Sequence, residues 1–327
     1  MSLLEITDLT VTYPSASGPV LAVRGVDLAM DEGEKLGLAG ESGCGKSTLA
    51  LSLLRLLPRG ARVAGTIRFD GEDILTMGWG RLRAVRWAAA SIVFQGAMHA
   101  LNPVRSVGDQ VAEPILVHEK VPKAAPRRKV AELLEQVGLA PSTARAYPHQ
   151  LSGGQRQRVM IAMALACSPR LIVADEPTSA LDVMIQAQIL RLVDRLVTDR
   201  GISLLLISHD LSVLTSACDR LAVMYAGRIV EEGPAGQVFS DPLHPYSSAL
   251  AAAYPRIGDA TARRNPQGLP GDPPDPSHLP EGCSFQPRCP VALGECVRTD
   301  PPLWPAGPAR RAACVHVRDS CPGAAHG

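Results

Sequence analysis

A glycine-rich segment near the start of the chain limits what this sequence can fold into more than any other feature. It covers residues 40–47 and reads GESGCGKS. A short apolar run at residues 35–39 precedes it, and apolar residues at helical spacing follow from residue 47 to 57, closed by Pro58. A segment of this kind binds phosphate groups when it joins a strand to a helix. The sequence therefore predicts a strand–loop–helix unit built around a phosphate-binding loop.

The residue types in this loop suit the binding of a nucleoside triphosphate with Mg²⁺. Its glycines allow a tight turn in which successive N–H groups point at phosphate oxygens. Lys46 is expected to reach the β- and γ-phosphates, and the Ser47 hydroxyl is expected to ligate Mg²⁺. The predicted nucleotide contacts from this segment are Gly40, Ser42, Gly43, Cys44, Gly45, Lys46, Ser47 and Thr48.

Two further motifs stand downstream of the loop. Residues 151–155 read LSGGQ, and residues 171–176 read LIVADE. An apolar run that ends in Asp-Glu is by itself more often a strand meeting solvent. Its position about 20 residues after LSGGQ makes the interpretation specific. We expect Asp175 to hold Mg²⁺, directly or through water, and Glu176 to polarise the attacking water as general base.

Length and charge restrict the class of protein. The chain has 327 residues, which favours about two domains. Its 33 basic and 32 acidic residues leave a net charge of +1, so nothing in the charge balance supports a nucleic-acid partner. No signal peptide is visible and no apolar run approaches the ~18 residues of a spanning helix. We therefore expect a cytosolic protein, with any membrane spans supplied by other chains.

The order of predicted elements indicates an α/β fold. Strands are predicted at residues 3–13, 21–30, 171–174 and 204–207, and a hairpin at 221–232. Strands that alternate with helices predict a mainly parallel sheet covered on both faces. The largely helical stretch from about residue 73 predicts an inserted helical subdomain. After residue 254 prolines and glycines dominate, which predicts a linker and a small C-terminal region.

The combined motifs resemble the ATP-binding subunits of ABC transporters, and the resemblance covers essentially the whole chain. It implies a P-loop NTPase core of ABC type at residues 1–254, with a helical subdomain at about 73–168 and a Cys-rich extension at 255–327. It also assigns further roles by position. Tyr13 would stack on adenine, Gln95 would contact Mg²⁺ and water, Asp182 would belong to the D-loop, and His209 would be the switch histidine.

In this family the LSGGQ motif serves the nucleotide of a partner. The resemblance implies that Ser152, Gly153, Gly154 and Gln155 face the γ-phosphate held by the loop of a second subunit. ATP then joins a head-to-tail dimer, and hydrolysis releases it. Every catalytic position of the family pattern is matched here. The sequence therefore predicts a subunit that hydrolyses ATP.

Motifs near the end of the chain indicate which group of ABC ATPases it resembles. Residues 241–246 (DPLHPY), residues 269–271 (LPG) and the cysteine spacing resemble the C-terminal extension of oligopeptide and dipeptide importer ATPases, with nickel importers as close relatives. Four thiolates suit zinc or an iron–sulfur cluster, and the resemblance favours [4Fe-4S] with Zn²⁺ as the alternative. A further alternative is that these thiols bind no metal. Cys321 is an additional cysteine outside the four-cysteine pattern, and His244 and His316 are minor candidate ligands. The four predicted ligands are Cys283, Cys289, Cys296 and Cys314.

The resemblance implies an ATPase that drives peptide import across the cytoplasmic membrane. Its expected partners are a second ABC ATPase (similar or identical), two transmembrane permease subunits and an extracellular solute-binding protein. The expected location is the cytoplasmic face of the membrane. Nickel or another small solute is the alternative cargo. A non-transport ABC ATPase of DNA repair or translation fits less well, since the chain has one core, no heptad run and nearly no net charge. Another alternative is that the tail senses redox state or iron and thereby controls the ATPase activity.

Overall fold

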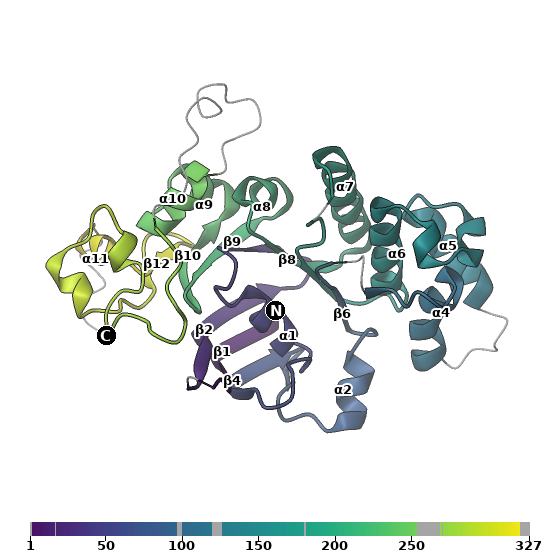
Figure 1. Ribbon diagram of the computed structural model, residues 1–327, viewed down its shortest axis with the longest axis horizontal. Coiled ribbons are helices and arrows are strands. Elements are labelled where there is room, and N and C mark those ends of the chain that lie inside the picture. The colour runs from purple at the N-terminus through teal and green to yellow at the C-terminus, as the bar shows by residue number, and fades with distance from the viewer. Residues whose placement is uncertain are drawn as a thin grey trace. The chain divides into compact units, whose positions relative to one another are not determined.

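The chain divides into two compact units in a computed structural model (Figure 1). The structure describes residues 2–16, 18–96, 100–119, 126–179, 181–253, 269 and 271–320. The first unit consists of Met1–Met30, Lys35–Leu75 and Ile207–Gly327. The second consists of Asp31–Glu34 and Thr76–Leu206. Most of the predicted linker at 255–280 and the extra Cys321 lie outside the described residues.

One sheet of the first unit is antiparallel. Its strands follow the order β2-β1-β4-β5, and Figure 1 shows β2, β1 and β4 side by side in purple and blue. Apolar residues alternate with polar ones along β1, so that Leu4 and Ile6 are buried and pair with Phe69 and Ile67 of β4. This alternation is what a strand with one buried face requires. The strand bounds are Ser2–Tyr13 for β1, Val20–Asp31 for β2, Arg62–Phe69 for β4 and Glu72–Asp73 for β5.

The other strands of the first unit follow the order β11-β12-β10-β9-β3. Strand β3 runs parallel to β9, with Leu38 opposite Ala222. Strands β9 and β10 form the predicted hairpin. Strand β12 pairs with β10 through Glu231 and Ala312, so the C-terminal region extends the sheet of the core. The bounds are Lys35–Ala39 for β3, Arg220–Tyr225 for β9, Arg228–Pro234 for β10, Trp304–Pro305 for β11 and Arg311–Ala312 for β12.

Short helices complete the first unit. Helix α1 follows the glycine-rich loop, and α8 packs on β3 and β9. The remaining helices fall within residues 235–320, where Ala312, Cys314 and Val317 form a small apolar core. The bounds are Lys46–Ser52 for α1, Leu211–Ala217 for α8, Ala235–Ser240 for α9, Pro245–Ala253 for α10, Gln286–Arg288 for η4, Gly294–Val297 for η5 and Val315–Ser320 for α11.

A buried charge network fixes this C-terminal region to β10. The Glu231 side chain is completely buried and forms an ion pair with Arg310, Nη2 to Oε1 3.2 Å. Its carboxylate also accepts the backbone N–H groups of Leu243 and His244. A buried carboxylate is costly unless it is paired and hydrogen-bonded. Glu231 meets both conditions, so the contact orders the residues on both sides of it.

The second unit combines three strands, in the order β8-β7-β6, with the predicted helical segment. All five residues of β7 are buried, and β7 runs parallel to β6. Continuous apolar runs of this kind are typical of parallel strands covered on both faces. Among the described residues, no helix is both long and apolar enough to cross a bilayer. The strand bounds are Ala90–Val93 for β6, Leu171–Asp175 for β7 and Ser203–Ser208 for β8.

The helices of the second unit pack on one another and on its strands. Helices α4, α5 and α6 are mutually in contact, and α6 also contacts β6 and α7. The structure therefore confirms that this part of the chain is largely helical, as the sequence predicts. The bounds are Trp79–Val85 for α2, Val107–His118 for α4, Pro126–Gln136 for α5, Pro141–Arg145 for η1, Pro148–Gln150 for η2, Gly153–Leu165 for α6 and Val183–Arg200 for α7.

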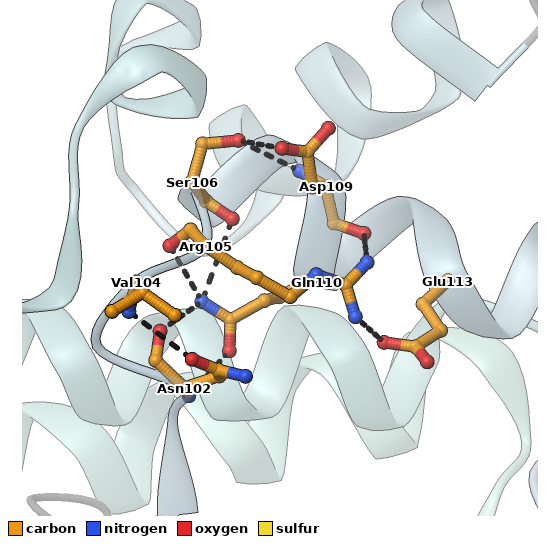
Figure 2. A network of polar contacts seen from close by, with 7 residues as sticks. All are labelled: Asn102, Val104, Arg105, Ser106, Asp109, Gln110 and Glu113. Atoms are coloured by element: carbon orange, nitrogen blue, oxygen red, sulfur yellow. Dashed lines mark hydrogen bonds and ion pairs between the residues drawn. The ribbon is translucent and has the colours of Figure 1, made fainter.

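A buried glutamine organises the loop that leads into α4 (Figure 2). The Gln110 side chain donates to the carbonyl oxygens of Asn102 and Arg105 and accepts the N–H of Asn102 at 2.8 Å. Ser106 caps the helix by accepting the N–H of Asp109. Val104 of this loop is 80% exposed, and its N–H donates to Asn102 Oδ1 at 3.1 Å.

Candidate active site

The glycine-rich loop lies between β3 and α1, as the sequence predicts. Two of its glycines have conformations that other residues rarely adopt, with φ 154° at Gly40 and 107° at Gly45. A Cβ atom on Gly40 would lie 2.3 Å from the Met224 carbonyl oxygen, and one on Gly45 would lie 2.3 Å from that of Ala22. Both positions therefore require glycine, and the loop is packed directly against the neighbouring backbone.

The lysine of the loop is already fixed in place. The Lys46 ammonium donates to the carbonyl oxygens of Gly40 and Glu41, each at 2.7 Å. The residue is only 5% exposed. Lys46 thus places a positive charge inside the loop, where the β- and γ-phosphates are expected.

Cys44 fills the space beneath the loop. Its sulfur lies 3.7 Å from the Lys46 nitrogen. Burial raises the pKa of the Cys44 thiol, and the nearby Lys46 charge opposes this only in part. The neutral thiol therefore packs inside the loop. Any contact of Cys44 with nucleotide would come from its backbone, whereas Ser42 and Gly43 are exposed.

Two other predicted residues of the first unit lie at the ends of strands. Tyr13, the last residue of β1, donates a hydrogen bond from its hydroxyl to Thr48 Oγ1 of α1 at 3.3 Å. This contact brings the half-buried tyrosine beside the helix that follows the loop. His209 is exposed directly after β8, next to Asp210, which caps α8 by accepting the N–H groups of Ser212 and Val213.

In the second unit the predicted catalytic carboxylates stand at the end of β7. Asp175 is its last residue and is 5% exposed. Glu176 follows with φ 43°, a left-handed conformation that costs energy for a residue with a side chain. Gln95 Nε2 donates to Glu176 Oε2 at 2.8 Å. The structure therefore brings Gln95 and Glu176 into direct contact.

The LSGGQ motif forms the start of α6. Ser152 caps this helix by accepting the Gln155 N–H, and the Gln155 side chain accepts the Ser152 N–H in return. A Cβ atom on Gly154 would lie 2.8 Å from Cγ2 of Ile185 in α7. Asp182 caps α7 by accepting the Ile185 N–H at 2.9 Å. The LSGGQ motif is therefore packed against α7, the helix that follows the predicted D-loop. Ala180 of the D-loop lies outside the described residues.

The structure adds residues that the sequence interpretation missed. Arg288 of η4 forms an ion pair with Glu41 of the glycine-rich loop, and Tyr246 of α10 accepts the Glu41 N–H. Arg288 stands directly before Cys289 in the tail motif. The motif was interpreted only for its cysteines, so its arginine received no role.

The structure gives no support for the predicted iron–sulfur cluster or zinc ion at the four cysteines. In the described part of the chain, no three Cys, His, Asp or Glu side chains are grouped so that they could hold a metal ion. Burial raises the pKa of Cys289 and Cys314, and raises that of Cys283 to about 11, with smaller contributions from the neighbouring thiols. Cys296 Sγ accepts the Leu293 N–H at 3.4 Å. The predicted [4Fe-4S] cluster and its Zn²⁺ alternative are therefore not supported.

The two histidines considered as minor ligands have other partners. His244 Nδ1 accepts the Tyr246 N–H at 3.0 Å, and burial lowers the pKa of His244 to about 3. His316 Nε2 lies 2.9 Å from the Val291 carbonyl oxygen. Both side chains thus have structural contacts in the C-terminal region.

Comparison with known proteins agrees with this geometry. The family model described as "ABC transporter" matches residues 23–179, and that described as "Oligopeptide/dipeptide transporter, C-terminal region" matches residues 230–296. The oligopeptide transport ATP-binding protein OppD of Salmonella typhimurium is 43% identical over 314 residues, which cover 95% of this chain and 93% of the relative. OppD of Escherichia coli is 43% identical over 315 residues, covering 96% and 93%.

A solved structure shows the same fold. The ATP-binding cassette MJ0796, in a dimeric post-hydrolysis state bound to ADP and phosphate, has a TM-score of 0.64 and 28% identity to this chain. The match covers 71% of this chain and 98% of the cassette. The chain therefore belongs to the ABC transporter ATP-binding proteins of the oligopeptide/dipeptide type, and it is an ATPase with the ABC ATPase fold.

Proposed function

We propose that this chain is the ATP-hydrolysing subunit of an importer for oligopeptides. The observation that carries the proposal is its similarity, over more than nine tenths of its length, to OppD proteins. The match at residues 230–296 to the oligopeptide/dipeptide C-terminal region supports the same cargo class.

The site residues take distinct roles in this proposal. Lys46 and the N–H groups of the glycine-rich loop bind the phosphates, and Tyr13 contacts adenine. Oxygen donors from Ser47, Gln95 and Asp175 are the ligand types that Mg²⁺ prefers. When bound, Mg²⁺ neutralises charge on the phosphates.

Glu176 is proposed as the general base for water. Its carboxylate is oriented by the hydrogen bond from Gln95, at 2.8 Å, and by a backbone whose carbonyl accepts from Ser179. A base held in one orientation can accept a proton from water without first reorganising. His209 is proposed to act at the γ-phosphate, by its position after β8.

A second subunit is proposed to complete the reaction. Ser152, Gly153, Gly154 and Gln155 would contact the nucleotide of a partner ATPase, and the rigid capping of α6 supports a preformed phosphate contact. MJ0796, which shares the fold, was solved as a dimer bound to ADP and phosphate. We propose that the partner is a second ABC ATPase, similar or identical.

The remaining partners follow from an importer role. We propose two permease subunits in the membrane, an extracellular solute-binding protein, and a location at the cytoplasmic face of the membrane. The chain itself would not contact the cargo.

An uptake assay tests the cargo. A strain lacking this gene would be complemented with the wild-type chain, with Glu176→Gln or with Lys46→Ala, and uptake of a labelled tripeptide and of ⁶³Ni²⁺ would be measured. We expect peptide uptake only with the wild-type chain. Restored nickel uptake without peptide uptake would reject the peptide cargo while leaving the ATPase role intact.

Purification from native membranes in mild detergent tests the partners. Two multi-spanning permeases and a second ATPase should co-purify with a tagged wild-type chain. A preparation free of membrane proteins, or one enriched in ribosomal or DNA-binding proteins, would contradict the transport role.

A further inference from the structure

A carboxylate is built into the phosphate-binding loop. Glu41 is the second residue of the GESGCGKS segment, and its side chain is largely buried, at 18% exposure. A negative charge at this position opposes the binding of nucleotide phosphates, because like charges repel strongly in a partly buried site. The loop therefore needs a cation to compensate Glu41.

That cation comes from the C-terminal region. Arg288 forms a two-pronged ion pair with Glu41, with Nη1 to Oε2 at 2.7 Å and Nη2 to Oε1 at 3.0 Å. The arginine side chain is only 6% exposed. Paired hydrogen bonds of this kind fix geometry as well as charge. The residues are 247 positions apart in the sequence, and both belong to the first unit.

Aromatic rings hold the arginine in place. The Arg288 guanidinium lies 5.9 Å from the ring centres of both Tyr225 and Phe285, and Nη1 donates to the Tyr225 hydroxyl at 3.4 Å. The hydrogen bonds to Glu41 raise the pKa of Arg288, so it stays charged. Contacts with ring faces and a phenol leave a guanidinium little freedom to turn away.

The backbone of Glu41 is held as well. Its N–H donates to the Tyr246 hydroxyl at 2.8 Å, and its carbonyl oxygen accepts from Lys46. Tyr246 is completely buried and packs on Tyr225 with ring centres 4.5 Å apart. The loop conformation at Glu41 is thus set by its own lysine and by two residues from the last third of the chain.

A small cavity lies beside this contact. It has a volume of about 150 Å³ and is lined by Glu41, Ser42 and Gly43 of the loop and by Pro273, Pro274 and Leu279 of the tail. The proline-rich segment therefore lies beside the loop as well. Two separate parts of the C-terminal region lie against the phosphate-binding residues.

We propose that Arg288 is a positioning residue for the nucleotide, which acts by neutralising Glu41 and fixing the conformation of the phosphate-binding loop. The C-terminal region thereby sets the ATP affinity of the core. The inference rests on the proposed role of this loop in ATP binding. It predicts an effect on the KM for ATP much larger than the effect on kcat.

ATP affinity and hydrolysis of the purified full chain test the proposal. Arg288→Gln removes the charge and keeps much of the volume. It should raise the dissociation constant and KM for MgATP by about 10-fold, with kcat within about twofold. Glu41→Gln/Arg288→Gln removes both charges, and should restore the affinity to within about threefold of wild type. This rescue would not occur if Arg288 served only to fold the tail.

Three variants serve as controls. Arg318→Ala breaks another arginine ion pair of the same tail, with Glu295, and should leave the ATP affinity unchanged. Arg288→Lys keeps the charge and should give an intermediate affinity. Lys46→Ala should abolish binding, which shows that the measured ATP occupies this loop.

Each outcome decides the proposal. An Arg288→Gln variant with wild-type affinity would overturn it, and so would a double variant as weak as the single one. If Arg288→Gln failed to fold, the double variant, which leaves no lone buried charge, would still have to bind ATP nearly as well as wild type. A wild-type chain that bound no ATP would instead reject the proposed role of the loop itself.

Discussion

The Gln95 side chain donates a hydrogen bond of 2.8 Å to the Glu176 carboxylate, across 81 positions of sequence. Glu176 follows the buried strand β7 and has φ 43°. The side chain proposed as general base therefore has a direction that the contact with Gln95 defines. A strained backbone of this kind persists when surrounding contacts hold it, and here Gln95 and Ser179 supply them.

Changing Glu176 to Gln should stop hydrolysis without stopping ATP binding. The amide keeps the size of the side chain but cannot accept a proton, so we expect kcat to fall by at least about 100-fold. Phosphate release and MgATP binding would be measured on the same preparation. Glu113→Gln, which alters a half-exposed carboxylate of α4, is the matched control. Near-normal hydrolysis by Glu176→Gln would reject the general-base role.

Changing Lys46 to Ala should raise the dissociation constant for ATP by at least about 100-fold. The change removes a buried charge from the loop, along with its hydrogen bonds to the Gly40 and Glu41 carbonyls. Binding would be measured by calorimetry with MgATP. Lys129→Ala removes an ammonium that is paired with Glu119 elsewhere, and should bind ATP normally. Tight binding by the Lys46 variant would contradict the assignment of this loop.

Local patterns in the sequence were enough to predict the core. The strand–loop–helix around Lys46, the buried strand before Asp175 and the β9–β10 hairpin all depend on neighbouring residues, and the structure confirms them. The contact of Gln95 with Glu176 was not predicted, because it joins distant segments. Both residues were nevertheless predicted as site residues, because each stands at the expected place in the order of ABC ATPase motifs.

The contacts that the C-terminal region makes with the core could not be predicted from the sequence. The ion pair between Arg288 and Glu41 and the pairing of β12 with β10 depend on how the tail returns to the core. The cysteines led to a metal site because thiols close in sequence suit metals. Among the described residues the structure does not support that site, and Cys296 Sγ instead accepts the Leu293 N–H. Spacing alone does not show whether thiols bind a metal ion.

Changing Gly154 to Ala should disturb the start of α6. The new Cβ would lie 2.8 Å from Ile185 Cγ2, and a β-branched side chain cannot easily move aside. We expect a loss of about 1–3 kcal/mol in the free energy of unfolding, measured in urea. Gly154→Ala/Ile185→Ala should recover part of it by removing the clash. Gly236→Ala in α9, where no atom lies within 4 Å of the new Cβ, should not destabilise the protein.

Changing Gln110 to Ala should destabilise the protein through the loop before α4 (Figure 2). The variant loses the bonds to Asn102 and Arg105 and leaves backbone groups without partners. Since Gln110 is 4% exposed, we expect a loss of about 1–3 kcal/mol in urea unfolding. Arg105→Ala breaks an ion pair whose side chains are 40% and 46% exposed, and should cost at most about 1 kcal/mol. Equal losses from both variants would contradict the role of the buried amide.

His244 should make stability depend on pH in the weakly acidic range. Its pKa is lowered to about 3 by burial, against an ordinary value of about 6.5. The unfolded chain therefore binds a proton that the folded chain excludes. The stabilisation by neutral His244 is complete above pH 6.5 and is lost as the pH falls toward 3, by up to about 1.4 kcal/mol per pH unit.

His244→Gln should remove this slope from urea unfolding measured between pH 4 and 7. His278→Gln alters an exposed histidine paired with Asp275 and should keep the wild-type slope. A His244 variant with an unchanged slope would show that other groups cause the acid sensitivity.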